Sequence, residues 1–396
     1  MNFIFISPHF PHTYWNFCDR LKKNGANVLG IGDAPYSSLE EKLKESLTEY
    51  YFVDDLGNYE KVFRAVAFLS FKYGKIDWIE SNNEYWLTQD ARLRTDFNVQ
   101  SGIRSDKIDF IKEKSLMKKI FLENGIPTAR QHKVTDFESA KKFIELTDYP
   151  VIVKPDVGVG ATNTWKLKNE DDLRNFYEHK PELPYVMEEF IEGDICSYDA
   201  IINSKSEPLF ESMTVWPPSI MDIVEKKLDL WYYTEATVPE KLRELGRKTV
   251  KAFDVKSRYV HLEFFRLKNP KGTLGSAGDF VALEVNMRPA GGYTPDMMNF
   301  AHSTDVYQIY ADMVTSDQML LKQKAESCFC TYASRRDGYD YVHSHDEILK
   351  KYGRKIVMCE EMPEMNWPQM GRYMYTAKTA DLVETWEFIN FVQERR

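Results

Sequence analysis

The sequence predicts an α/β protein, mixed α+β over its whole length, on three observations. Strand and helix patterns alternate through the N-terminal part, turn residues such as Asn24-Gly25 and Gly32-Asp33 end several of them, and 43% of the 396 residues are hydrophobic. Such alternation is typical of a parallel, doubly wound sheet with right-handed crossovers. At about 150 residues per domain, the length suggests two or three domains.

The N-terminal part contains four expected strands separated by helical segments. The strands are Phe3–Ser7, Asn27–Ile31, Tyr51–Val53 and Ile76–Glu80, and the helices are Tyr14–Lys23, Tyr59–Tyr73 and Tyr85–Phe97. Val62, Val66 and Leu69 recur at three- and four-residue intervals, which indicates a helix with one buried face. Because Gly30-x-Gly32 is not a complete G-x-G-x-x-G motif, a dinucleotide site is poorly supported.

The rest of the chain continues with a helix, a compact unit and a tail. A basic helix is expected over Asp106–Asn124, since Gly125 and Pro127 are residues that end helices. Residues 128–191 contain expected strands at Val151–Lys154, Trp165–Leu167 and Tyr185–Ile191, and helices at Phe137–Thr147 and Glu170–Tyr177. Later strands are expected at Tyr198–Ile202, Arg258–Leu267, Phe280–Asn286 and Phe329–Ala333, and helices at Leu242–Phe253, Val306–Val314, Asp346–Tyr352 and Asp381–Val392.

Composition and charge exclude several classes of protein. The net charge of −9, from 52 basic and 61 acidic residues, argues against a nucleic-acid or anionic-membrane surface. No apolar run approaches the roughly 20 residues of a spanning helix, and the start lacks the basic region of a signal peptide. Five cysteines, an odd number, do not resemble a disulfide framework. We therefore expect a cytoplasmic protein without nucleic-acid or membrane partners.

The first candidate constellation is a lysine at the end of a buried strand, followed by glycines. Lys154 ends the run Val151–Lys154, and Gly158 and Gly160 follow it. Glycine allows backbone N–H groups to approach an anion closely, and lysine adds a point charge for phosphate. The alternative is a hairpin loop with an exposed lysine.

The second constellation is a pair of strands that carry carboxylates. Glu284, Asn286 and Arg288 alternate along one face of a strand, opposite Val281, Leu283 and Val285. If this strand forms a hairpin with Arg258–Leu267, Glu263 can face Glu284. Two carboxylates and an amide oxygen suit Mg²⁺, and Arg288 beside them could clamp an anionic group. The alternative is the polar outer face of an antiparallel strand.

The third constellation is a pair of glutamates in an apolar strand. Glu188 and Glu189 lie within Tyr185–Ile191, shortly before Gly193 and Asp194. Acids inside an apolar run need a partner or water. The alternative to a binding site is an edge strand with solvated carboxylates.

Taken in this order, the three constellations resemble the ATP-grasp superfamily, over about residues 100–325. The single motifs are degenerate, but their order and spacing are specific. Within the superfamily the chain is most similar to carboxylate–amine ligases, including bacterial L-amino-acid ligases. The resemblance implies a Rossmann-like leading domain (1–105), an ATP-grasp domain (106–327) with a mobile lid subdomain at about 128–190, and a small C-terminal subdomain (328–396) packed on the ATP-grasp body.

The resemblance also implies roles for individual residues. Lys114 matches the first lysine that contacts phosphate, and Lys154 the second. The loop that contains Gly158 and Gly160 resembles the lid over the phosphates. Glu188 to Ile191 resembles the hinge at adenine, with backbone contacts at Glu189 and Ile191. Glu263, Glu284 and Asn286 match the ligands of Mg²⁺ (or Mn²⁺), and Arg288 matches the arginine that stabilises the transferring phosphoryl group.

The sequence departs from the family pattern at the ribose site and leaves several points open. The glutamate that usually follows the hinge glycine by two residues is Ile195, so either Asp194 takes its role or ribose is held differently. Trp231, Tyr232 and Tyr233 lie where such enzymes often carry a substrate loop, although ordinary packing accounts for any one of them. Arg335 and Arg336 could reach a substrate carboxylate.

By resemblance, the expected activity is ligation of a small carboxylate, such as an amino acid, to an amine through an acyl phosphate, with release of ADP and phosphate. Two alternatives remain open: an ATP-grasp enzyme of the purine or carboxylase type, acting on bicarbonate or a ribotide, and a nucleotide-binding regulator without turnover. The expected partners are small-molecule carboxylate and amine substrates. The oligomeric state is open, with a homodimer as one option.

Overall fold

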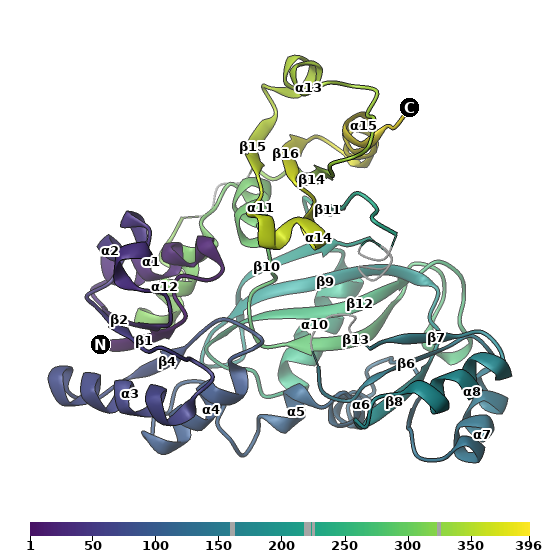
Figure 1. Cartoon of the computed structure of the whole chain (residues 1–396), viewed down its shortest axis with the longest axis horizontal. Helices are drawn as coiled ribbons and strands as arrows, with labels where there is room; N and C mark the ends of the chain where they lie inside the picture. The colour runs from purple at the N-terminus through teal and green to yellow at the C-terminus, as the bar shows by residue number, and fades with distance from the viewer. Residues whose placement is uncertain (159–162, 218–222, 224–225, 323–325) are drawn as a thin grey trace.

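The computed structural model describes residues 1–158, 163–217, 223, 226–322 and 326–396 (Figure 1). These ranges contain three β-sheets of four, eight and four strands, with helices packed on them. Short 3₁₀ helices occur at His12–Tyr14, Tyr36–Ser38, Gly272–Leu274 and Glu364–Asn366.

The N-terminal sheet has the strand order β3-β2-β1-β4, and all of its pairs are parallel. Its elements are β1 (Asn2–Ile6), α1 (Trp15–Lys23), β2 (Asn27–Gly32), α2 (Glu41–Ser46), β3 (Glu49–Phe52), α3 (Tyr59–Tyr73), β4 (Trp78–Glu80) and α4 (Leu87–Asp96). Side chains of a strand alternate between faces. Phe3 and Phe5 pack with α1 and with α12 (Val306–Ser316), whereas Ile4 and Ile6 pack with α3 and α4. The predicted parallel, doubly wound sheet is therefore confirmed.

The small sheet is antiparallel and has the order β5-β8-β6-β7. Its elements are β5 (Gln131–Lys133), α7 (Phe137–Thr147), β6 (Val151–Pro155), β7 (Trp165–Leu167), α8 (Glu170–His179) and β8 (Tyr185–Glu189). Ile144 of α7 and Phe176 of α8 pack against Val153. Because β8 lies between β5 and β6, Glu188 and Glu189 are on an internal strand, and the edge-strand alternative is wrong.

The eight-stranded sheet is antiparallel, in the order β13-β12-β9-β10-β11-β14-β16-β15. Its strands are β9 (Gly193–Ile202), β10 (Pro208–Val215), β11 (Trp231–Thr234), β12 (Arg258–Leu267), β13 (Phe280–Asn286), β14 (Phe329–Arg335), β15 (Ile356–Glu361) and β16 (Tyr373–Thr379). The remaining helices of this part are α10 (Glu240–Ala252), α11 (Thr294–His302), α13 (His345–Tyr352), α14 (Trp367–Met370) and α15 (Leu382–Gln393).

The C-terminal strands continue this sheet, at the top of the view in Figure 1. Tyr233 of β11 pairs with Thr331 of β14, so hydrogen bonding crosses the boundary predicted at residues 327 and 328. The domain boundaries themselves stay predictions. Strands β10, β11, β15 and β16 and helices α2, α11 and α14 were not predicted.

The helix predicted for Asp106–Asn124 is wrong as a single element. It is two helices, α5 (Asp109–Lys112) and α6 (Lys114–Glu123), separated by Glu113 in an extended conformation. The backbone N and Oγ of Ser115 each donate to the Asp156 carboxylate at 2.8 Å. A partner far along the chain thus satisfies free N–H groups at the start of α6.

Strand β13 forms the predicted hairpin with β12, but it contains a bulge at Leu283. Glu263 is opposite Glu284, as predicted. The bulge shifts the alternation by one residue. Val281 therefore packs on the Glu284 side of the sheet, while Val285 packs in the core on the other side. The prediction that Val281, Leu283 and Val285 share one face is wrong for this reason.

Two further observations concern membranes and disulfides. Among the described helices, none is long and apolar enough to cross a membrane. All five cysteines lie in the described ranges, and all are free: Cys18, Cys196, Cys328, Cys330 and Cys359.

Candidate active site

The predicted metal ligands lie together on the β12–β13 hairpin. Glu263 and Glu284 are paired in the register, and Asn286 is paired with His261. The side chains of Glu263 and Glu284 are 24% and 23% exposed, so a ligand can reach them. Asn286 is buried, and its Nδ2 has no hydrogen-bond partner among the described residues.

These donors fit Mg²⁺ better than a metal that needs a full protein cage. The described residues contain no group of three or more His, Cys, Asp or Glu side chains arranged for a metal. A pair of carboxylates with one amide matches an ion that takes few protein oxygens and completes its shell with phosphates and water.

The two carboxylates have opposite pKa shifts. Burial raises the pKa of Glu284. Burial acts in the same direction on Glu263, but the hydrogen bond from His261 and the charges of His261, Arg288 and Lys154 hold the pKa of Glu263 below its ordinary value. A bound cation would favour the charged form of both.

Lys114 is positioned by the break between α5 and α6. Its backbone N donates to the Asp156 carbonyl oxygen at 2.9 Å. Its Nζ lies 3.3 Å from Oε1 of Glu284 and 3.2 Å from the Gly158 carbonyl oxygen, to which it donates. The first predicted lysine thus connects the Glu284 carboxylate to the start of the glycine loop.

Lys154 and Glu188 face each other across the paired strands β6 and β8. The Lys154 Nζ lies 2.8 Å from Oε2 of Glu188, and the Lys118 Nζ lies 3.0 Å from Oε1. Burial would raise the pKa of Glu188, but the two ammonium groups hold it well below its usual range. Burial lowers the pKa of Lys118, while Glu188, Glu284 and Glu263 raise that of Lys154 against the effect of burial.

Lys118 is a site residue that the sequence analysis missed. It is buried and also donates to Oγ1 of Thr128 at 2.7 Å. The available signal was its position four residues after Lys114, which places both lysines on one face of a helix.

The predicted hinge residues Glu189 and Ile191 and the ribose candidate Asp194 each lie among different neighbours. The Glu189 carboxylate accepts hydrogen bonds from the backbone N of Arg130 at 2.7 Å and from its guanidinium at 2.9 Å. Ile191 is buried in a small apolar cluster. Asp194 lies at the start of β9, where it forms an ion pair of 3.0 Å with Lys268. The contacts found in the described residues do not connect Asp194 to the paired lysines and carboxylates.

Arg288 follows β13 and contacts the N-terminal part of the chain. Its Nη1 donates to the Pro289 carbonyl oxygen at 2.9 Å, and its Nε lies 3.5 Å from Oε2 of Glu84. Lys112 forms an ion pair of 2.6 Å with the other oxygen of Glu84. Glu84 was not predicted, although it follows a strand end of a parallel sheet, where ligands of such sheets bind.

Gly158 lies within the described residues, and its carbonyl oxygen accepts the hydrogen bond from Lys114. Gly160 and the rest of the predicted lid loop, 159–162, lie outside the described residues.

Behind Glu263 lie two further residues that the sequence did not reveal, His261 and Asp199. His261 is buried between carboxylates, with Nδ1 at 2.7 Å from Asp199 and Nε2 at 3.2 Å from Glu263. Burial would lower the pKa of His261, but the two carboxylates raise it to about 9. The ring is therefore cationic at neutral pH in this structure.

The aromatic and arginine residues left open by the sequence analysis mostly pack within the protein. Tyr232 stacks on Tyr332 and on Trp216, with ring centroids 4.6 and 4.7 Å apart. Trp231 and Tyr233 pack around the Trp386 ring.

The two arginines bind backbone carbonyl groups. Arg335 donates from Nε to the carbonyl oxygen of Val392 at 2.5 Å. Arg336 donates to the Leu228 carbonyl oxygen at 2.6 Å and to that of Pro368 at 2.9 Å. Both guanidinium groups thus stabilise the fold in this structure.

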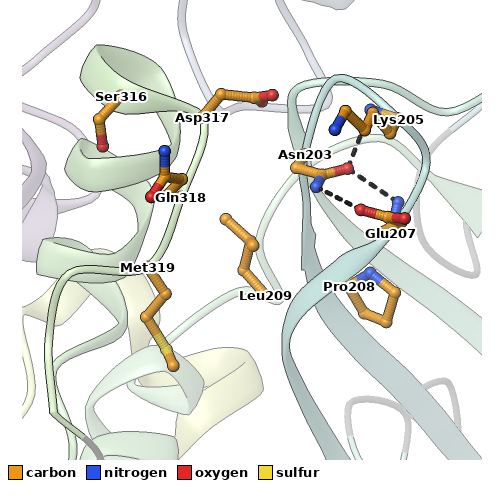
Figure 2. Close-up of a pocket in the computed structure, with 9 residues that line it drawn as sticks. All are labelled: Asn203, Lys205, Glu207, Pro208, Leu209, Ser316, Asp317, Gln318 and Met319. Atoms are coloured by element: carbon orange, nitrogen blue, oxygen red, sulfur yellow. Dashed lines mark hydrogen bonds between the residues drawn. The ribbon is translucent and has the colours of Figure 1, made fainter.

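A surface hollow lies away from these groups. It has a volume of about 690 Å³ and lies between the β9–β10 turn and the end of α12 with the residues that follow it. Figure 2 shows the residues that line it, with Asn203 and Glu207 hydrogen-bonded to each other. None of the predicted site residues lines it, so we place the candidate active site at the lysine and carboxylate groups.

Part of the chain matches a known protein family. The family model of the ATP-grasp domain matches residues 111–255. Residues 111–255 therefore belong to the ATP-grasp superfamily. The match includes Lys114, Lys118, Lys154 and Glu188, and the Glu263 and Glu284 hairpin follows it directly along the chain.

Two curated proteins are similar to parts of this chain. It is 29% identical over 130 residues to the C-terminal section of the carbamoyl phosphate synthase large chain of Methanopyrus kandleri, covering 32% of this chain and 23% of that one. It is 25% identical over 283 residues to the L-arginine-specific L-amino acid ligase of Bacillus subtilis, covering 69% and 65%. The matches thus span less than two thirds of either relative.

Solved structures share the fold along nearly the whole chain. An L-amino acid ligase from Bacillus licheniformis has a TM-score of 0.71 at 14% identity, covering 98% of this chain and 96% of its own. The biotin carboxylase domain of the 2-oxoglutarate carboxylase of Hydrogenobacter thermophilus, in complex with MgADP and bicarbonate, has a TM-score of 0.66 at 14% identity, covering 92% and 83%. At this identity the likeness shows the fold.

Proposed function

We propose that the protein is an ATP- and Mg²⁺-dependent carboxylate–amine ligase that forms an acyl phosphate, with an amino acid on at least one side. The observation that carries this proposal is the convergence of Lys114 with Glu284, which is paired with Glu263, close to Lys154 and Arg288. The similarity to an L-arginine-specific L-amino acid ligase supports the choice of substrate class.

The chemistry needs positive charge, because a carboxylate and ATP repel each other. In the proposed reaction a carboxylate oxygen attacks the γ-phosphorus and ADP leaves. The amine then attacks the acyl carbon, phosphate leaves, and the amine loses a proton. Lys114 and Lys154 would bind phosphate oxygens, and Arg288 would stabilise the transferring phosphoryl group.

The remaining predicted residues complete the nucleotide site in this proposal. Mg²⁺ bound by Glu263, Glu284 and Asn286 would supply Lewis-acid charge neutralisation at the phosphates. Backbone groups at Glu189 and Ile191 would meet adenine. The loop with Gly158 and Gly160 would cover the phosphates and exclude water, which protects an acyl phosphate from hydrolysis. Asp194 remains the candidate residue for binding ribose, although in this structure its carboxylate forms an ion pair with Lys268.

A second candidate is an ATP-grasp enzyme of the carboxylase or purine type. The fold likeness to a biotin carboxylase domain crystallised with bicarbonate supports it. In that case the same lysines and carboxylates would serve, and bicarbonate or a ribotide would replace the amino acid.

Incubation with ATP, Mg²⁺ and a panel of amino acids tests the proposal. We expect ADP and phosphate to appear only when both a carboxylate and an amine are present, with a condensed product detected by mass spectrometry. A parallel incubation with bicarbonate or a ribotide tests the second candidate. If ATP binds but no amino-acid panel yields product, the ligase proposal is wrong.

A further inference from the structure

A compact group of polar side chains lies on one face of the large sheet, beside the proposed metal ligands. In the register, Asp199 of β9 is paired with His261 of β12, and Ser197 of β9 is paired with Glu263 of β12. Because side chains alternate along a strand, the residues two apart on each strand share a face. Glu263 is thus one corner of a four-residue grid.

Direct hydrogen bonds connect the grid. The distance from His261 Nδ1 to Asp199 Oδ1 is 2.7 Å, and that from His261 Nε2 to Glu263 Oε1 is 3.2 Å. Ser197 Oγ donates to the second oxygen of Asp199. Both ring nitrogens of His261 face carboxylate acceptors, so the ring is fixed from both sides.

The inner part of this hydrogen-bonded grid is closed to solvent. Asp199 and Ser197 have no exposed surface, and His261 is 4% exposed. Trp216 covers the group, with its ring edge-on to His261 at a centroid distance of 6.0 Å and its indole N–H donating to Ser197. Buried charged groups are costly to desolvate and add little net stability compared with apolar packing. Because the buried grid contacts Glu263, a proposed metal ligand, it can have a role beyond stabilising the fold.

We propose that Asp199 and His261 are positioning residues that hold Glu263 in the orientation needed to bind the divalent cation. The proposal rests on the proposed function, in which Glu263 is a metal ligand. His261 holds Oε1 of Glu263, which leaves Oε2 for the cation. Side chains that orient a ligating group in this way typically change metal affinity about 10- to 100-fold when they are removed.

Two substitutions of His261 separate this role from simple packing. An Asn amide corresponds in position to Nδ1, so His261→Asn keeps the donor to Asp199 and loses the donor to Glu263. A Gln amide corresponds to Nε2, so His261→Gln keeps the donor to Glu263. His302→Gln is the matched control, because His302 is also a largely buried histidine, bonded to Ser212 at 2.9 Å on a different part of the sheet.

Calorimetric titration with ADP over a series of free Mg²⁺ concentrations measures the apparent Mg²⁺ affinity of each variant. We expect His261→Asn to weaken this affinity about 10- to 100-fold, with unchanged ADP binding in the absence of metal. His261→Gln should restore most of the loss, and His302→Gln should match the wild type. If His261→Asn does not fold, Asp199→Asn carries the same test, with a weakened Mg²⁺ affinity as the expected result.

The outcomes separate this proposal from the proposed function. If ADP binding by the wild type does not depend on Mg²⁺, both are wrong. If it does, and Glu263→Gln weakens the Mg²⁺ dependence while the folded His261→Asn or Asp199→Asn variant equals the wild type, the positioning proposal alone is overturned. Equal losses in His261→Asn and His261→Gln would also overturn it, because the donor to Glu263 would then be irrelevant.

Discussion

Replacing Glu188 by Gln should destabilise the protein strongly, because Glu188 neutralises two buried lysines at once. Its carboxylate lies 3.0 Å from Lys118 and 2.8 Å from Lys154, whose side chains are 5% and 12% exposed. Lys154 keeps the nearby charges of Glu284 and Glu263, whereas Lys118 loses its main partner. Removing one partner of a buried ion pair costs about 3–5 kcal/mol, which is the expected loss for Glu188→Gln.

Glu189→Gln is a matched control on the same strand. Glu189 is as buried as Glu188, but its ionic partners Arg130 and Lys271 are 53% and 38% exposed and can turn to water. An ion pair with an exposed partner contributes about 0–1 kcal/mol to the free energy of unfolding, so Glu189→Gln should cost little. Urea unfolding followed by circular dichroism measures both variants. If Glu188→Gln is no less stable than Glu189→Gln, the buried lysine pair does not need the Glu188 charge and the reasoning is refuted.

Three further predictions concern the site, packing and pH. Glu284→Ala and Arg288→Ala should each abolish ATP turnover while the thermal midpoint stays near that of the wild type; retained turnover would contradict their roles. Gly246→Ala should lower the midpoint, because a Cβ would lie 2.5 Å from the Tyr198 ring and overpacking costs about 1–3 kcal/mol. Burial lowers the pKa of His302 from 6.5 to about 4, so the unfolded state binds more protons between these values and the wild type loses stability as the pH falls. His302→Gln should therefore gain about 2 kcal/mol relative to the wild type between pH 7 and pH 5, measured by urea unfolding at both; a constant difference would contradict this.

Much of the fold could be predicted because its signals are local. The helix at Tyr59–Tyr73 and the strand at Phe280–Asn286 have the predicted bounds, since apolar spacing and turn residues define both. The facing of Glu263 and Glu284 followed from hairpin pairing and strand alternation. The predictions that failed concern features that depend on distant partners. The break between the helices at Glu113 is an example, because contacts of Ser115 with Asp156 stabilise it.

The residues missed in the candidate site have the same explanation. Glu84, Asp199 and His261 come from three strands or strand ends that meet only in the folded chain. In the sequence, His261 lies between the apolar residues Val260 and Leu262, where a histidine has no distinctive signal. Its partner Glu263 lies two residues further along the same strand, but its partner Asp199 becomes visible only once β12 is paired with β9.

Transfer of oxygen from the carboxylate substrate to phosphate tests the central proposal most directly. The substrate pair that yields product is supplied with ¹⁸O in the carboxylate, and the released phosphate is analysed by mass spectrometry. An acyl phosphate intermediate predicts one ¹⁸O atom in each phosphate, together with ADP. Unlabelled phosphate, or release of AMP and pyrophosphate, would contradict the proposed mechanism.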